Sequence, residues 1–304
     1  MRFQTILACM AATPLLVGAA EPVTLAPTGP WVLDYAAKSC RLSRTFGTAA
    51  DPTTILFESP SPDSMSMVAM GTQLKVSTGV PVTARFSPGL WPHEGEGGRS
   101  ADEQKPAALW SRISVTPDEL ASAAAAKEKT MRRFRNQRPP PIDLAEVAAD
   151  RLKIKAFAAT VTHVEINERG RRPTRLRTGS LVRAMTMLEQ CTRDQLRSWG
   201  VDPAVEEKIA RPAWPIRMDR WFRSSDYPTA ALAKGGQSVV AFRLLVDANG
   251  KPTQCTPLTH FKAPEFPKAV CDILMSRGRF EPAELADGSK VSSYYSGNIS
   301  WRLQ

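Results

Sequence analysis

Five cysteines are spread unevenly along this 304-residue sequence, and their placement limits how the chain can fold. Cys9 lies in an apolar N-terminal segment, Cys40 and Cys191 are far apart, and Cys255 and Cys271 lie close together near the C-terminus. What these residues do depends on the redox compartment, because disulfides persist mainly in oxidising surroundings. The N-terminal segment, which indicates the compartment, is therefore the first pattern to interpret.

Residues 1–20 have the pattern of a secretory signal peptide. Arg2 provides a short basic start, residues 6–17 are mostly apolar, and small residues follow up to Ala20, where we expect cleavage. The alternative is an uncleaved anchor in the inner membrane. A membrane span needs about 20 apolar residues, whereas this run is shorter and is interrupted at Pro14. The pattern therefore favours export of a mature protein that begins at residue 21.

Export favours disulfide bonds over free thiols. Without Cys9, four cysteines remain, and four cysteines allow three pairings. If the chain has two domains, one bridge within each is the simplest arrangement, which predicts the disulfides Cys40–Cys191 and Cys255–Cys271. The sequence has only three histidines and no C-x-x-C spacing, so we predict no metal site.

The composition is typical of a soluble globular protein with room for about two domains. Hydrophobic residues make up 42% and charged residues 23% of the chain, which excludes a collagen-like or fully disordered chain. The net charge of +10 permits anionic partners but identifies none, because it is spread over the whole chain. We interpret the basic stretches 132–138 and 169–177 as solvated loops, and export argues against nucleic-acid binding.

Residues 21–201 are predicted to form an N-terminal α+β domain of unknown type, with mixed strands and helices. Its first part contains short runs typical of strands. These predicted strands lie at residues 31–35, 40–46, 54–57, 65–70 and 80–86. The stretch 88–105 is rich in glycine and proline and is predicted to be a loop.

Helical patterns follow in the second part of this block. Residues 116–119 read Thr-Pro-Asp-Glu, a capping box that predicts a helix to about residue 129. A proline triplet at 139–141 predicts a rigid spacer, and 145–158 could be helix or strand. Another helix is predicted to start after Thr178 or Ser180 and to end at Gly200, with Cys191 on its buried face.

Residues 202–222 contain three prolines among charged residues and are predicted to be the linker to a second domain at 223–304. The predicted order in that domain is helix, strand, strand, helix, strand. These elements are expected at residues 225–234, 237–246, 251–259, from 266 onward, and up to 303, with an Asn-Gly hairpin turn at 249–250. The overall fold class is therefore α+β with two domains.

Several short motifs of residues 224–304 resemble the C-terminal domain of the TonB family. They are Tyr227-Pro228 with Ala231, Gly236 before Val239-Val240-Ala241-Phe242, Val246-Asp247 with Gly250, Phe280 with Pro282-Ala283, and the ending Ile299-Ser300-Trp301-Arg302. Each motif is short, but their order and spacing together match the family. The resemblance implies a small three-stranded antiparallel sheet with two helices.

The resemblance also implies a way of binding partners. An exposed sheet edge would take up a short extended segment of a partner, such as the TonB box of an outer-membrane transporter, by β-augmentation. The last strand is the predicted edge, with candidate binding residues Tyr294, Tyr295, Asn298, Ile299 and Trp301. The opposite interpretation is that this strand only buries one face on its own core. TonB-like domains can also exchange strands, which would give a homodimer.

Three functions remain open from the sequence. The first is a periplasmic, non-catalytic TonB-like protein that binds an outer-membrane or envelope protein. The second is a TonB-type energy transducer for transmembrane transport that keeps residues 1–20 as its anchor. The third is an exported enzyme with a TonB-like localisation module. No catalytic motif or cofactor-binding motif is present, and His93, His163 and His260 are interpreted as structural or surface residues, so we predict no enzyme activity, no cofactor and no small-molecule substrate.

Overall fold

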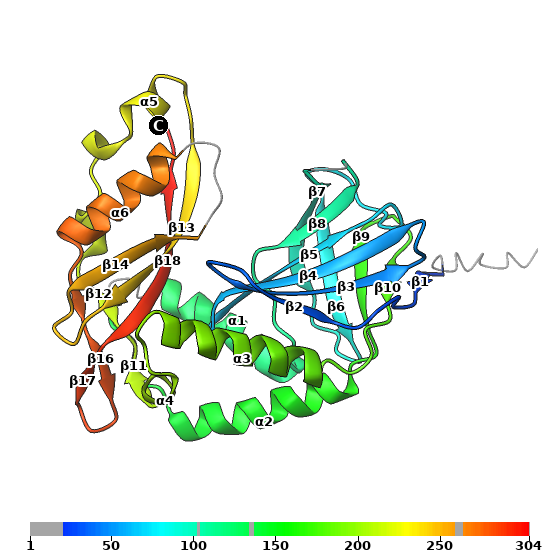
Figure 1. Cartoon of the computed structure of the whole chain (residues 1–304), viewed down its shortest axis with the longest axis horizontal. Helices are drawn as coiled ribbons and strands as arrows, with labels where there is room; N and C mark the ends of the chain where they lie inside the picture. Colours follow the sequence, from blue (N-terminus) through cyan, green and yellow to red (C-terminus); the bar gives the residue numbers. More distant parts are fainter. Residues whose placement is uncertain (1–20, 102–103, 134–136, 259–263, 304) are drawn as a thin grey trace, which may run out of the picture.

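The computed structural model describes residues 21–101, 104–133, 137–258 and 264–303, and the predicted signal peptide 1–20 lies outside them. The fold is α+β (Figure 1). Buried hydrophobic side chains form two clusters, one drawn from residues 40–191 and the other from residues 213–301. Among the helices in the described ranges, none has the length and apolar character needed to cross a membrane.

A ten-stranded sheet dominates the first part of the chain. Its neighbouring strands are antiparallel except β1 and β10, which run parallel, and the order is β1-β10-β9-β6-β7-β8-β5-β4-β3-β2. The strands are β1 (Val23–Leu25), β2 (Val32–Tyr35), β3 (Cys40–Gly47), β4 (Pro52–Ser61), β5 (Ser64–Met70), β6 (Pro81–Ser87), β7 (His93–Arg99), β8 (Pro106–Trp110), β9 (His163–Glu168) and β10 (Thr174–Leu176). All five strands predicted in this block are confirmed.

The two ends of this sheet approach each other. The chain that leaves β1 returns to β3, where Gly47 N–H donates to the carbonyl of Ala26 and Thr28 N–H donates to the carbonyl of Thr45, both at 2.9 Å. Between these bonds, Pro27 pairs with Phe46. The sheet therefore curls, and residues next to both outer strands hydrogen-bond to β3.

The predicted loop at 88–105 is wrong in part, because residues 93–99 form β7. A Cβ atom at Gly95 would lie 2.6 Å from the carbonyl oxygen of Leu109, and one at Gly97 would lie 2.2 Å from that of Ser77. These glycines therefore allow close backbone approach within a sheet, whereas in the sequence they resemble loop residues.

Three helices accompany this sheet: α1 (Asp118–Arg133), α2 (Leu144–Thr160) and α3 (Val182–Ser198). The predicted capping box of α1 does not form, since the Thr116 hydroxyl hydrogen-bonds to Ser114, and the Asp118 carboxylate accepts from the backbone N–H groups of Leu90 and Trp91. Neither Thr178 nor Ser180 caps α3, whose N-cap is Leu181. Helix α3 packs against β2, β3 and β4 and extends toward the C-terminal elements (Figure 1).

The C-terminal part contains a three-stranded antiparallel sheet with the order β14-β13-β18. Its elements are α5 (Thr229–Leu232), β13 (Ser238–Val246), β14 (Pro252–Pro257), α6 (Glu265–Arg277) and β18 (Ser293–Trp301), preceded by the short 3-10 helices η1 (Met218–Arg220) and η2 (Ser224–Asp226). Strand β13 buries Val240, Phe242, Leu244 and Val246 on one face, as its alternation predicts. The predicted order is confirmed for these helices and strands, but three short strands between α6 and β18 were not predicted.

The segment 202–222, expected to act only as a linker, contains secondary structure that pairs with the C-terminal part. It forms the helix α4 (Pro203–Glu206) and the strands β11 (Ile209–Arg211) and β12 (Trp214–Pro215). Strand β11 pairs with β16 (Ala283–Leu285), which also pairs with β17 (Lys290–Val291), and β12 pairs with β15 (Phe280–Glu281). Ahead of it in the chain, Arg138 donates to Glu281 at 3.0 Å and to the Pro282 carbonyl at 2.7 Å. This segment is therefore attached to the C-terminal part along much of its length.

Both predicted disulfides are confirmed. Cys40–Cys191 joins β3 to α3 and closes a sequence separation of 151 residues. Cys255–Cys271 joins β14 to α6 across 16 residues. Each bridge fixes one helix to one strand, and each lies within one of the two parts of the molecule.

Candidate protein-binding site

Strand β18 lies at an edge of the C-terminal sheet. Its nine residues pair with β13 from Ser238↔Trp301 to Val246↔Ser293. Within the described ranges, no strand pairs with its other side. Such an edge offers a row of backbone N–H and C=O groups to an added strand.

The register shows which residues offer these groups. In an antiparallel sheet, the N–H and C=O of one residue point to the same side, and successive residues alternate. Leu258 N–H donates to the Ala241 carbonyl at 2.9 Å, so Ala241 points toward β14 and its neighbours Val240 and Phe242 point toward β18. Their partners on β18 are Ile299 and Gly297. The backbone groups that point away from the sheet therefore belong to the even-numbered residues Tyr294, Ser296, Asn298 and Ser300.

The candidate residues from the sequence divide between the two faces of this strand. The side chains of Tyr295, Ile299 and Trp301 pack on the domain's own core, and their backbone groups point toward β13. Asn298 is exposed and its backbone points outward. Tyr294 also belongs to the outward set, but its side chain contacts the first part of the chain. Sequence reasoning omitted Ser296 and Ser300, because alternation alone does not reveal which residues face a missing neighbour.

Side chains from the first part of the chain cover part of the sheet's outer face. The ring of Tyr294 meets the ring of Trp199 edge-on with centroids 6.0 Å apart, and its hydroxyl donates to Asp63 at 3.2 Å. The Ser293 hydroxyl donates to Glu206 at 2.8 Å. Trp199 lies directly after α3 and Asp63 in the turn between β4 and β5, so three separate segments reach the start of β18.

Arg243 on β13 has its side chain in the middle of this contact. It is 4% exposed, its guanidinium lies 3.4 Å from the ring centroid of Trp199, and it donates to the Pro60 carbonyl at 3.0 Å. Burial lowers the pKa of Arg243 to about 10. A cation over an aromatic face is stabilised more strongly when water is excluded, so the Arg243–Trp199 pair holds the two parts together.

Two further groups at this contact have shifted pKa values. Burial raises the pKa of Glu206 to about 7, and the nearby negative charge of Asp63 adds to the shift, while the hydrogen bond from Ser293 opposes it. Burial also raises the pKa of Tyr294, with Asp63 and Glu206 contributing in the same direction. The contact therefore favours neutral forms of Glu206 and Tyr294.

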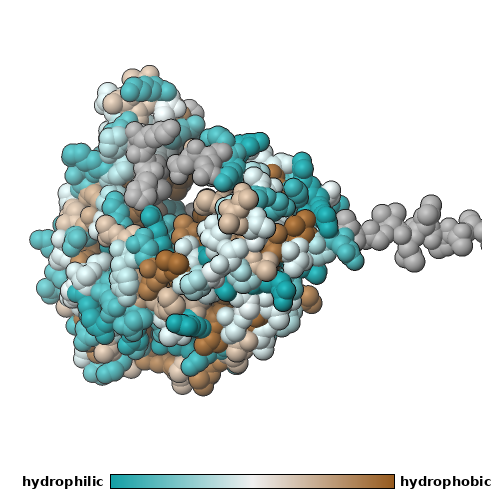
Figure 2. All heavy atoms as spheres, turned by 45° about the vertical axis from the view of Figure 1, so that its right-hand side comes forward, coloured by the Kyte–Doolittle hydropathy of each residue, from teal (hydrophilic) through white to brown (hydrophobic). Residues whose placement is uncertain are grey.

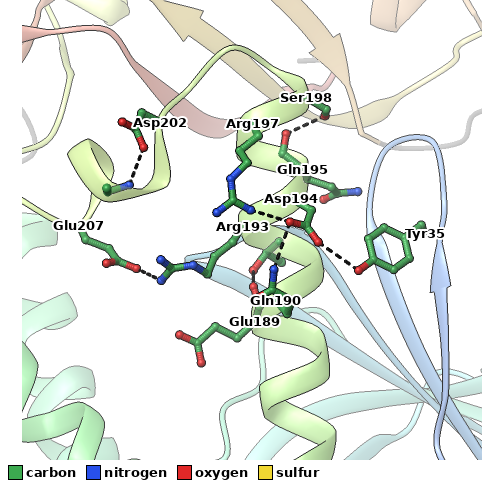
Figure 3. Close-up of polar contacts among 12 residues, drawn as sticks. Tyr35, Glu189, Gln190, Arg193, Asp194, Gln195, Arg197, Ser198, Asp202 and Glu207 are labelled. Atoms are coloured by element: carbon green, nitrogen blue, oxygen red, sulfur yellow. Dashed lines mark hydrogen bonds and ion pairs between the residues drawn. The ribbon is translucent and has the colours of Figure 1, made fainter.

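A polar network on the last turns of α3 holds this helix in place (Figure 3). The Asp194 carboxylate accepts from the Tyr35 hydroxyl at 3.2 Å, from Gln190 at 3.1 Å and from Arg197 at 2.6 Å. The neighbouring Arg193 pairs with Glu207, directly after α4. These bonds connect α3 to β2 on one side and to α4 on the other, and they position Trp199.

His93 and His163 lie in the described part of the chain, whereas His260 lies outside it. Glu165, two residues after His163, pairs with Arg175 at 2.7 Å, while His163 contacts the Thr162 hydroxyl at 2.9 Å. Burial lowers the pKa of both His93 and His163. No group of three metal-ligating side chains occurs among the described residues.

The remaining surface offers little that resembles an enclosed binding site. An open depression of about 480 Å³ lies over β6, β7 and β9 and includes Arg85, Glu94 and Arg169 in its lining. On the face shown in Figure 2, hydrophobic residues are scattered in small groups among hydrophilic ones. The β18 edge therefore remains the best-defined candidate site.

Comparison with known proteins identifies the family of the C-terminal part. Residues 223–303 match the family described as the C-terminal part of the Gram-negative bacterial TonB protein. The C-terminal part of the chain is thus a TonB C-terminal domain. No curated protein matches the chain.

Proposed function

We propose that this protein is a periplasmic, non-catalytic TonB-like protein that binds an extended segment of an outer-membrane or envelope protein along β18. The observation that carries the proposal is the unpaired side of β18, at which Ser296, Asn298 and Ser300 direct backbone groups outward. Two of these residues, Asn298 and Ser300, are exposed. Main-chain pairing would provide affinity, and the exposed side chains would influence specificity.

The family supports both the partner and the location. TonB family proteins are associated with the cell envelope, and their C-terminal domain interacts with outer-membrane transporters. The predicted signal peptide adds an export route. Disulfides in both parts of the molecule suit an oxidising compartment such as the periplasm.

Peptide titration by calorimetry tests the proposal with the chain 21–304. The probes are synthetic TonB-box peptides from outer-membrane transporters, with scrambled peptides as the control. Asn298→Pro removes one outward N–H and leaves the ladder between β13 and β18 unbroken, since proline is tolerated on the free side of an edge strand. We expect the loss of this hydrogen bond and of local strand geometry to weaken binding by about tenfold or more.

Asn298→Ala is the matched control, because it removes the side chain but keeps the backbone donor. We expect the alanine variant to bind within about threefold of the original chain, because a lost exposed side-chain contact costs well below 1 kcal/mol. Equal loss in both variants would indicate side-chain recognition instead of strand addition. If no TonB-box peptide binds to the original chain, this partner class is excluded. Sedimentation velocity distinguishes a monomer from a homodimer that forms through the β18 edge.

A further inference from the structure

The contact between the two parts of the chain contains a carboxyl group that can change charge near neutral pH. Glu206, at the last position of α4, accepts from the Ser293 hydroxyl of β18 at 2.8 Å. Burial raises its pKa to about 7 from an ordinary value of 4.5.

The groups around Glu206 come from every element at this contact. Asp63 from the turn between β4 and β5 and Tyr294 from β18 both interact with it electrostatically. Arg243 from β13 interacts electrostatically with Tyr294, and it retains its positive charge because its pKa is about 10. On the side of α3, Arg193 pairs with Glu207. An ionised Glu206 would therefore place a second negative charge near Asp63, at a position where Glu206 itself is half-buried.

We propose that this contact is a pH-sensitive latch: it is closed when Glu206 carries a proton, and it weakens when Glu206 ionises. The latch consists of three interacting pairs: Trp199 with Arg243, Tyr294 with Asp63, and Glu206 with Ser293. Opening it would separate the end of α3 from the outer face of the β13–β18 sheet. It would uncover Tyr294 and the first residues of the β18 edge.

The direction of the pH dependence follows from the linkage between closing of the latch and protonation of Glu206. In the closed state the pKa of Glu206 is about 7, and in the open state, where water reaches the carboxyl group, it returns toward its ordinary value. A group whose pKa is raised in the closed state stabilises that state at low pH, and this contribution is lost as pH rises from the open-state pKa to the closed-state pKa. The latch therefore closes most firmly below about pH 5 and is weakest above about pH 7.

Peptide-resolved hydrogen exchange on the chain 21–304 between pH 5 and 8.5 tests the latch without any partner. After correction for the intrinsic pH dependence of exchange, peptides that contain residues 199–208 report its opening. We expect the opening equilibrium of the original chain to rise by about 30- to 300-fold across this range. In Glu206→Gln, which stays neutral, it should stay flat.

Glu189→Gln is the matched control, because Glu189 lies on the exposed side of α3 (Figure 3) and its side chain takes no part in the contact. It should follow the original chain. Asp63→Asn provides a second test that does not depend on the folding of Glu206→Gln: without the neighbouring charge, the rise should be smaller and centred at lower pH. A flat profile in the original chain, or an unchanged rise in Glu206→Gln or in Asp63→Asn, would overturn the latch.

Discussion

The two parts of this molecule use the same covalent device on sheets that end differently. In each part a disulfide fixes a helix to a strand, α3 to β3 and α6 to β14. The ten-stranded sheet curls so that the chain after β1 returns to β3, whereas the three-stranded sheet ends at β18. An edge without a hydrogen-bonded neighbour can accept another strand, so the C-terminal sheet is better suited to bind an extended partner.

The comparison also shows what the first part contributes to the second. The first part both covers Arg243 and compensates its charge, because the guanidinium lies over Trp199 and donates to the Pro60 carbonyl. The first part therefore stabilises an outer sheet face that carries a charge at its centre. It leaves the second half of β18, with Asn298 and Ser300, exposed.

The largest expected difference between the parts concerns their disulfides. In the chain-entropy model, a bridge stabilises more when it closes a longer loop, and the two loops span 151 and 16 residues. Replacing Cys40 and Cys191 by alanine should cost about 5 kcal/mol, and replacing Cys255 and Cys271 about 3 kcal/mol. Urea unfolding monitored by circular dichroism compares the two double variants. The opposite ranking would show that loop length does not govern their stability.

A smaller effect tests the close packing of the ten-stranded sheet. Gly97 and Gly98 are neighbours on β7, but a Cβ at Gly97 would lie 2.2 Å from the Ser77 carbonyl oxygen, whereas a Cβ at Gly98 meets nothing within 4 Å. Gly97→Ala should therefore lower the free energy of unfolding by about 1–3 kcal/mol. Gly98→Ala should change it by less than about 0.5 kcal/mol. Equal effects in thermal unfolding would mean that the strand moves freely away from Ser77.

The smallest expected effect is on stability in acid, and one hydrogen-bonded carboxylate in each part provides a test of it. Arg277 donates to Asp226 at 2.6 and 2.9 Å and lowers the pKa of that carboxyl group. Although burial opposes it, hydrogen bonds from Ser77 and Arg171 lower the pKa of Glu168 in the ten-stranded sheet. A lowered pKa contributes stability above the unfolded-state pKa, and that contribution is lost as pH falls below about 4.

The variants Asp226→Asn and Glu168→Gln measure these contributions separately. Each should cost about 1 kcal/mol at pH 7, and the difference from the original chain should shrink as pH falls toward 3. Urea titrations at pH 7, 5, 4 and 3 provide the comparison. A difference that stays constant with pH would show that the charge of the carboxyl group is not responsible.

Much of the local structure could be predicted because it depends on residues close in sequence. The alternation from Val240 to Val246 predicts a half-buried strand, and Gly200, which has φ of 78°, ends α3 as its type suggests. The disulfide pairing followed from the expectation of two separate cores. The strand β7 was not predictable in this way, because Gly95 and Gly97 are required by the backbone of Leu109 and Ser77, which are remote in sequence.

The strand that carries the candidate site was predicted, but its register with the neighbouring strand was not. The sequence indicates a terminal strand, yet only its register with β13 shows that Asn298, and not Ile299, directs backbone groups outward. Likewise, nothing near Arg243 in the sequence predicts that its guanidinium lies over Trp199, 44 residues earlier in the chain. Both features depend on how distant segments meet.

The sequence by itself determined the periodic burial within single helices and strands, the glycine positions at which helices end, and a C-terminal domain of the TonB type. The first two features follow from short-range sterics and from the alternation of apolar residues, whereas the third rests on the resemblance of residues 224–304 to the TonB family. The tertiary structure decided which backbone groups of β18 point away from its sheet, which charges are buried, and that β11 and β12 pair with the C-terminal part. The physical reason is that strand pairing, desolvation and charge compensation depend on neighbours that the chain brings together only when it folds.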